Sequence, residues 1–218
     1  ERHSFAMEIK KWEKNEYRQI LGEIWPDLTA FLDQEKVHNF SIWNCDSLIF
    51  GYYETDENNE FSEEKKASIQ ALTSRIDHTF TWISTPGENM RLMYHNFGVV
   101  RENKELIRHR MFITRLKLIA REYKARHDGL VAAREGRIDP GPDSNFSIWS
   151  AGGYIFGYDE IDTTMETEET PEAHEATVAW ETRQLGIMDW ITNDCDWLTG
   201  TVHSASVRLA WHMGEIES

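Results

Sequence analysis

Residues Asn145–Tyr158 read NFSIWSAGGYIFGY, and residues Asn39–Tyr52 read NFSIWNCDSLIFGY. The two stretches lie 106 positions apart (145 − 39 = 106) and share both NFSIW and IFGY. In each stretch, turn-forming residues separate two runs of alternating apolar and polar residues, which is the pattern of a β-hairpin. The chain is therefore predicted to contain two copies of a unit built around this hairpin.

The same offset extends the repeat upstream and downstream of the hairpin. It needs no gap from residue 2 to residue 54, and a match of that length indicates an internal duplication. The aligned pairs are Arg2-His3 with Arg108-His109, Tyr17 with Tyr123, and Glu54 with Glu160.

Composition limits the classes of partner. The 218 residues suffice for two units of about 100 residues each, a usual domain size. A formal net charge of −15 argues against nucleic acid or an anionic membrane as a partner, and no apolar run reaches the roughly 20 residues that cross a bilayer. Cys45 and Cys195 do not occupy equivalent repeat positions, so we interpret them as isolated thiols of a cytoplasmic protein. Because the sequence starts at Glu1, a removed leader would not be visible in it.

The first unit is predicted to contain six main elements. They are a strand over 3–9, a helix over about 12–35 with a bend before Pro26, a hairpin over 38–43 and 48–54, a helix over 65–83 and a strand over 90–97.

The second unit is predicted to repeat this order after a link over 98–107. Its elements are a strand over 108–116, a helix over about 120–135, the hairpin that starts at Asn145, a helix over about 173–192 and a strand over 205–213.

The order β-α-β-β-α-β is that of a ferredoxin-like unit, an α+β fold with two helices on one face of an antiparallel sheet. We expect one unit over residues 1–98 and another over 107–218. Each sheet would leave one apolar face uncovered, so the two faces are predicted to stack as an intramolecular pseudo-dimer, a two-sheet α/β barrel. The alternative is two independent units on a linker.

The copies differ on their first helices. His127 follows Tyr123 by four residues, whereas Leu21 follows Tyr17 at the same spacing. Residues four apart share a helix face, so the second unit places a phenol beside an imidazole. Histidine transfers protons near neutral pH, which makes His127 a candidate general acid–base, and leucine cannot replace it. The alternative is a polar helix face in contact with solvent.

The chain resembles the L-rhamnose mutarotase family. The first helix contains NEY and IWPDL, and each hairpin runs from NFSIW into IFGY, similar to the family's IWPEL and NYSI…LFGY motifs. The resemblance covers nearly all of both halves. It implies that His127 is the proton donor and that Tyr123 contacts the sugar. The family's strand tyrosine corresponds to Phe146 here and to Phe40 in the first unit. The family's tandem tryptophan pair is absent, and Trp180 and Trp190, both expected on the helix over 173–192, do not align cleanly with it.

The resemblance implies a carbohydrate isomerase that interconverts the α and β anomers of L-rhamnose or a related monosaccharide. The expected site comprises catalytic His127 with Tyr123, Phe146 and Trp190 against the sugar, and the first unit would hold a degenerate site with Tyr17, Leu21 and Phe40. No Cys/His cluster, phosphate-binding glycine loop or nucleophile elbow occurs, so neither a metal nor another cofactor is expected. Two alternatives remain open: a non-catalytic sugar-binding module, and a cofactor-independent oxygenase or lyase on the same barrel.

Overall fold

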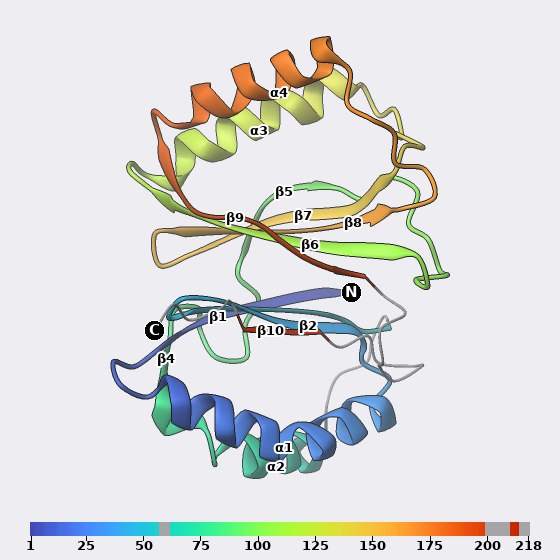
Figure 1. Ribbon diagram of the computed structural model, residues 1–218. Helices are drawn as coiled ribbons and strands as arrows, with labels where there is room; N and C mark the ends of the chain where they lie inside the picture. The colour runs from blue at the N-terminus through green and yellow to red at the C-terminus, as the bar shows by residue number, and fades with distance from the viewer. Residues whose placement is uncertain (57–61, 199–209, 214–218) are drawn as a thin grey trace. The chain divides into compact units, whose positions relative to one another are not determined.

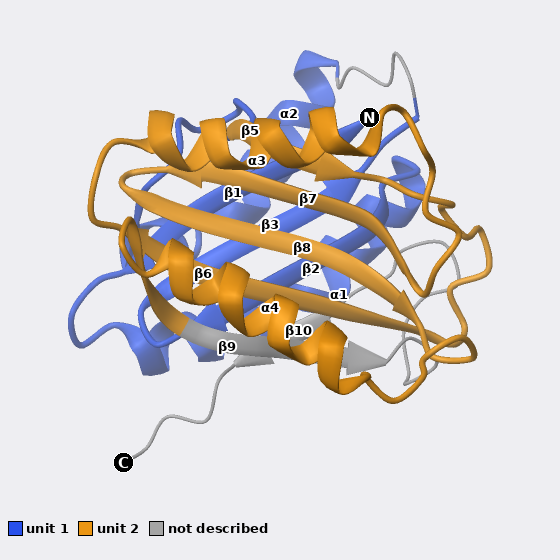
Figure 2. Ribbon diagram, turned by 90° about the horizontal axis from the view of Figure 1, so that it is seen from above, with its two compact units in different colours: residues 1–90, 202–218 blue, residues 91–201 orange. Residues whose placement is uncertain are grey.

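The computed structural model describes residues 1–56, 62–198 and 210–213, with side chains described up to Ile191. The chain forms two compact units, each treated separately below. Unit 1 comprises residues 1–90 and 202–218, and unit 2 comprises residues 91–201 (Figure 2). No helix in the described ranges is long and apolar enough to cross a membrane.

Unit 1 is a five-stranded sheet of order β10-β2-β3-β1-β4 with helices α1 and α2 on one face (Figure 1). Its elements are β1 (Arg2–Ile9), α1 (Lys14–Gln34), β2 (His38–Cys45), β3 (Leu48–Glu54), α2 (Glu63–Thr73), a 3-10 turn (Asp77–Thr79), β4 (Phe80–Trp82) and β10 (Ala210–Met213).

Unit 2 repeats this architecture, with sheet order β5-β7-β8-β6-β9 and helices α3 and α4 on one face (Figure 1). Its elements are β5 (Arg91–Asn96), β6 (Ile107–Leu116), α3 (Ala120–Arg134), β7 (Asp143–Ala151), β8 (Tyr154–Asp162), α4 (Pro171–Gln184) and β9 (Met188–Leu198). The predicted α+β fold with two ferredoxin-like units is therefore confirmed. The predicted stacking of the units as a pseudo-dimer stays a prediction.

The fourth strand of each unit lies earlier in the sequence than the predicted strand. The helix predicted over 65–83 ends at Thr73, and β4 follows at Phe80–Trp82. The helix predicted over 173–192 ends at Gln184, and β9 follows at Met188–Leu198. Both strands pair antiparallel with the first strand of their unit, so backbone pairing outweighed the apolar spacing that favoured longer helices.

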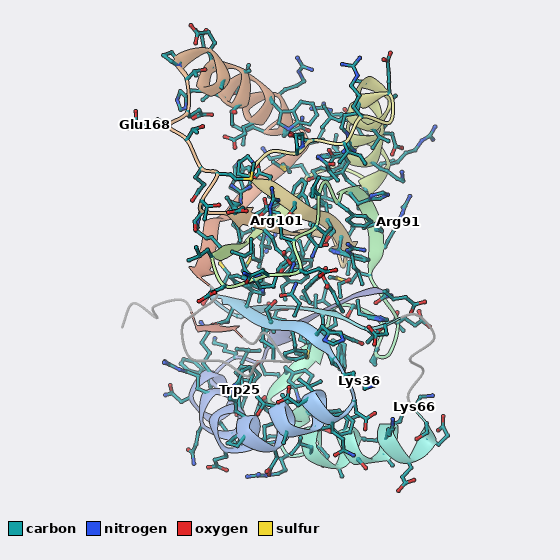
Figure 3. All side chains as sticks on the ribbon, turned by 90° about the vertical axis from the view of Figure 1, so that its right-hand side faces the viewer. Trp25, Lys36, Lys66, Arg91, Arg101 and Glu168 are labelled. Carbon is teal, nitrogen blue, oxygen red and sulfur yellow. The ribbon has the colours of Figure 1, made fainter. Side chains whose placement is uncertain are left out.

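The strand that follows each ferredoxin-like repeat joins the sheet of the other repeat. β5, predicted as the last strand of the first unit, pairs antiparallel with β7. β10 pairs parallel with β2. Arg91, at the start of β5, and Arg101, on the link after it, both belong to unit 2 (Figure 3). The compact units are thus 1–90 with 202–218 and 91–201, and the mutarotase-like units expected over 1–98 and 107–218 stay a prediction.

The link between β5 and β6 is held against the β7–β8 hairpin. Arg101 forms an ion pair with Asp162, with Nε 2.9 Å from Oδ2, and donates from Nη2 to the Gly141 carbonyl at 2.8 Å. Lys104 donates to the buried carboxylate of Glu160. These contacts hold the link in unit 2, and β5 itself pairs with β7 through the strand ladder.

The asparagine of NFSIW forms the same bulge in both units. Asn39 and Asn145 have φ of 52° and 53°, and the strand register shifts at each of them. Asparagine tolerates this left-handed conformation better than most residues. Its amide then donates to a glutamate carboxylate, from Asn39 to Glu54 at 3.3 Å and from Asn145 to Glu160 at 2.9 Å. The repeated motif therefore encodes a backbone kink and its hydrogen bond.

The glycine of IFGY lies beneath an aromatic ring in both units. A Cβ on Gly51 would lie 1.9 Å from Phe5 Cζ, and a Cβ on Gly157 would lie 2.0 Å from Phe112 Cε1. Phe5 pairs with Gly51 and Phe112 with Gly157, so the first strands are equivalent at an offset of 107 (112 − 5 = 107). The predicted ungapped alignment is thus wrong by one residue in these strands, and His3 and His109 are not equivalent.

Candidate active site

The candidate site lies on the helix-facing side of the unit 2 sheet, where α3 brings Tyr123 and His127 together. Both side chains are buried, at 2% and 5% exposure. Their rings stack with centroids 4.3 Å apart and an interplanar angle of 27°. The i, i+4 spacing therefore yields the predicted pair, and burial excludes the alternative of a solvated helix face.

A backbone hydrogen bond orients the imidazole of His127. Nδ1 lies 3.0 Å from the Tyr123 carbonyl oxygen, which can only accept, so Nδ1 carries the proton in the neutral ring. Nε2 is then the nitrogen with the lone pair. Burial lowers the pKa of His127 below 6.5, although the Tyr123 carbonyl and Asp128 oppose this shift. At neutral pH the residue is therefore a neutral base.

Burial raises the pKa of Tyr123 well above its usual value of 10. The phenol thus keeps its proton at physiological pH and can donate a hydrogen bond to a ligand. No described residue hydrogen-bonds this hydroxyl.

Two further aromatic rings contact His127. Tyr94 of β5 lies 5.2 Å from the imidazole between centroids, and Trp180 of α4 lies 5.7 Å away in an edge-to-face arrangement at 85°. Sequence reasoning missed Tyr94 because it assigned β5 to the first unit. It noted Trp180 without including it in the site.

Phe146 and Trp190 belong to the same aromatic cluster, one step further from the imidazole. Phe146 packs edge-to-face on Tyr94, with the ring centroids 5.6 Å apart. The ring centroids of Trp190 and Phe112 lie 5.7 Å apart, and those of Phe112 and Phe146 lie 6.3 Å apart. Trp190 lies on β9, not on the helix as predicted, and reaches the cluster from the sheet.

Gln184 is a polar group that sequence reasoning missed entirely. Its side chain is 2% exposed, and neither its amide nitrogen nor its amide oxygen has a partner. It lies four residues after Trp180 on α4 and therefore shares a helix face with it. The backbone carbonyl of Arg183, the preceding residue, accepts a hydrogen bond at 2.6 Å from Nη1 of Arg126, the neighbour of His127. Gln184 is thus a buried, unpaired hydrogen-bonding group on the helix face that carries Trp180.

Thr114 offers a second unpaired polar group beneath the helices. Its hydroxyl is fully buried without a partner. Thr114 pairs with Trp190 across β6 and β9 and lies two residues after Phe112, so it faces the aromatic cluster. Unpaired buried polar groups are costly and rare, which makes them candidates for ligand contacts.

In unit 1 the structure places Tyr17, Leu21 and Phe40 around one cavity of about 650 Å³. All three side chains are buried, at 2%, 3% and 6% exposure. The three residues therefore line one cavity, which has Leu21 where unit 2 has His127, and their assignment as a degenerate site stays a prediction.

Comparison with known proteins identifies the family. The family model described as L-rhamnose mutarotase matches residues 2–89. An L-rhamnose mutarotase from Oceanobacillus iheyensis (strain DSM 14371) is 31% identical over 70 residues, which are 31% of this chain and 67% of that protein. The family model thus covers the repeat with Leu21, whereas Tyr123 and His127 lie outside the matched range. Together, the fold and these matches show that the chain belongs to the L-rhamnose mutarotase family, whose members are isomerases acting on carbohydrates.

Proposed function

We propose that unit 2 is a sugar mutarotase site that interconverts the anomers of L-rhamnose or a related monosaccharide. The observation that carries the proposal is the buried His127, which has its Nδ1 proton bound to a backbone carbonyl and its ring enclosed by Tyr94, Tyr123 and Trp180. Such an imidazole is a fixed base with a known tautomer. Aromatic rings around it suit the apolar C–H faces of a sugar.

Ring opening requires one proton to move between two oxygens on the same carbon. His127 Nε2 takes the proton of the anomeric hydroxyl, the C1–O1 bond becomes a carbonyl, and the C1–O5 bond breaks. The imidazolium then returns the proton to O5. Both oxygens are bonded to C1, so one nitrogen can serve both. Rotation about C1–C2 and the reverse steps give the other anomer. Positioned proton transfer of this kind contributes about 10²–10⁴-fold.

Three polar groups of the site would hold the sugar hydroxyls. The Tyr123 phenol donates, Gln184 can donate and accept, and the Thr114 hydroxyl can do both. A bound sugar would satisfy buried groups that otherwise lack partners, and sites of this kind discriminate strongly for hydroxyl-bearing ligands. Tyr94 and Phe146 would face the apolar side of the ring or the methyl group of a 6-deoxy sugar.

The test is anomer exchange measured by saturation-transfer proton NMR on L-rhamnose. The wild-type protein should accelerate exchange, and His127→Ala should abolish the acceleration. Leu21→Ala is the matched control, because Leu21 holds the equivalent position in unit 1, and it should leave exchange unchanged. If Leu21→Ala abolished exchange and His127→Ala remained active, the activity would belong to unit 1 and the proposal would be wrong.

If the wild-type protein does not accelerate exchange of L-rhamnose, the same assay is repeated with other 6-deoxy sugars and with uronic sugars. Saturable sugar binding without exchange on any of them would favour a non-catalytic sugar-binding module.

A further inference from the structure

The cavity of about 650 Å³ in unit 1 falls within the range of about 300–1,000 Å³ that small-molecule sites occupy. Its walls come from β1, α1, β2, β3, α2 and the segment over residues 80–89. All of these lie in one compact unit, so the cavity is complete within it.

Among the differences between unit 1 and the site in unit 2, two introduce leucine. Leu21 replaces His127, and Leu72 replaces Trp180 at the offset of 108 that relates Trp82 to Trp190 (190 − 82 = 108). Leu72 packs against the buried cluster that contains Leu21. At these two positions unit 1 has aliphatic side chains in place of the imidazole and the indole, and the indole that lines its cavity is that of Trp82.

The aromatic wall and the phenol of the site are retained. Phe40, Tyr17 and Tyr53 line the cavity. Tyr17 is 2% exposed, and no described residue hydrogen-bonds its hydroxyl. Burial keeps this phenol protonated by raising its pKa. The apolar part of the wall is continued along α1 by Ile24, Leu28 and Leu32.

Most of the side chains that line the cavity are apolar, and its polar lining consists of Tyr17 and Tyr53 together with His3, Ser4, Gln70, Thr73, Asp77, Glu88 and Asn89. The apolar part of the wall does not suit a monosaccharide. A sugar would bury several hydroxyls against leucine and isoleucine, and each hydroxyl left without a hydrogen bond costs about 1–3 kcal/mol. A hydrocarbon body would instead gain roughly 25 cal/mol per Å² of apolar surface that it buries. One oxygen on that body would satisfy the Tyr17 hydroxyl, and the Ser4 hydroxyl, which is buried without a partner, offers a further contact for it.

We propose that the unit 1 cavity binds a neutral, mostly hydrocarbon small molecule that carries a hydroxyl or carbonyl oxygen. The aliphatic face of α1 and the rings of Phe40 and Tyr53 enclose the hydrocarbon body, and the Tyr17 hydroxyl binds its oxygen. Unit 1 is thus a second ligand site of different chemistry, not a weakened copy of the sugar site.

The test is a fluorescence titration of the full chain with N-phenyl-1-naphthylamine, a neutral apolar probe. The wild-type protein should bind it saturably at one site, and L-rhamnose should not displace it. Leu28→Trp fills the cavity with an indole and should weaken binding about tenfold or more, which corresponds to about 1.4 kcal/mol. Arg18→Trp, which places the same ring on the exposed face of α1, is the matched control and should bind as the wild type does.

Leu21→Asn provides a second variant of nearly unchanged side-chain size. It puts an amide into the apolar wall and should weaken probe binding several-fold, while circular dichroism reports whether the fold is retained. Absence of saturable binding, displacement by L-rhamnose, or unchanged affinity in both folded cavity variants would overturn the proposal. His127→Ala should bind the probe normally, so this inference and the proposed mutarotase activity can fail independently.

Discussion

One position on the first helix separates the two units chemically. His127 and Leu21 follow a buried tyrosine by four residues, and each has at most 5% exposure. The imidazole transfers protons and the isobutyl group does not. Because the Tyr123 carbonyl binds the Nδ1 proton, the protonation of Nε2 would determine when the proposed unit 2 site can act as a base.

The rate of anomer exchange should follow the protonation of His127. Its pKa is lowered by burial, so the neutral form predominates above pH 6.5 and the rate should stay level there. The rate should fall as the pH drops through the lowered pKa, because the imidazolium has no lone pair to accept the anomeric proton. Exchange rates measured from pH 4.5 to 8.5 test this, and a rate that rises on acidification would contradict the role of base.

The same pKa shift makes stability dependent on pH. Between the lowered pKa of the folded protein and 6.5, the unfolded chain binds a proton that folded His127 does not. The free energy of unfolding should therefore decrease as the pH falls through this window. Urea titrations should show a shallower decrease for His127→Asn than for the wild type, and an equal slope in both proteins would refute the assignment.

Gln184 should bind substrate without supporting the fold. Its amide is buried without a partner, so Gln184→Leu should leave the melting temperature unchanged or raise it. The same variant should raise KM for the sugar about tenfold, the effect of losing a hydrogen bond of about 1.4 kcal/mol. Gln184→Glu keeps the shape and an acceptor and should recover part of the binding. A lower melting temperature with unchanged KM would indicate a structural role instead.

At the level of elements, the NFSIW hairpin combines a backbone conformation with a buried hydrogen bond. The asparagine supplies a positive φ at the bulge, and its amide reaches a glutamate that Tyr52 in unit 1, or Tyr158 in unit 2, also contacts. The next residue, Phe40 or Phe146, starts the aromatic wall of its unit. The bulge therefore links the repeated motif to the position of a site residue.

Substitutions at Asn145 should separate the contribution of the positive φ to stability from that of the amide hydrogen bond. Asn145→Ala loses both the amide bond to Glu160 and the tolerance for φ of 53°, and should lower the free energy of unfolding by about 3 kcal/mol. Asn145→Gly restores the freedom to adopt a positive φ, so its loss of free energy of unfolding should be about 1 kcal/mol smaller than that of Asn145→Ala. Chemical denaturation of the two variants measures the difference, and equal losses would show that the conformation contributes nothing.

At the level of the whole molecule, each repeat is completed by a strand from the far end of the other. β5 follows the first repeat in sequence, yet it pairs with β7 and supplies Tyr94 to the site of unit 2. β10 follows the second repeat and pairs with β2. A protein divided at the end of the sequence repeat would therefore lose an edge strand from each sheet.

Hydrogen exchange can test to which unit β5 belongs. Gly157→Ala forces the Phe112 ring to move and should destabilise unit 2, and Gly51→Ala does the same to Phe5 in unit 1. The amides of β5 should lose more protection in Gly157→Ala than in Gly51→Ala. The opposite order would place β5 with the first repeat.

The sequence by itself predicted two copies of one unit, and it determined the ferredoxin-like order of elements and the Tyr123–His127 pair. These depend on local spacing: identical motifs at a fixed offset, and side chains four apart on one helix face. It also indicated where the first repeat lacks the imidazole.

Only the tertiary structure decided the fourth strands, the exchange of β5 and β10, the ring contacts of Tyr94 and Trp180, and the unpaired amide of Gln184. The apolar residues Phe80 and Ile83 fit helical spacing as well as a strand, and the choice came from pairing with β1 more than 70 positions away. Whether a polar group inside the fold lacks a partner depends on all of its neighbours at once, and no local pattern of residues records it.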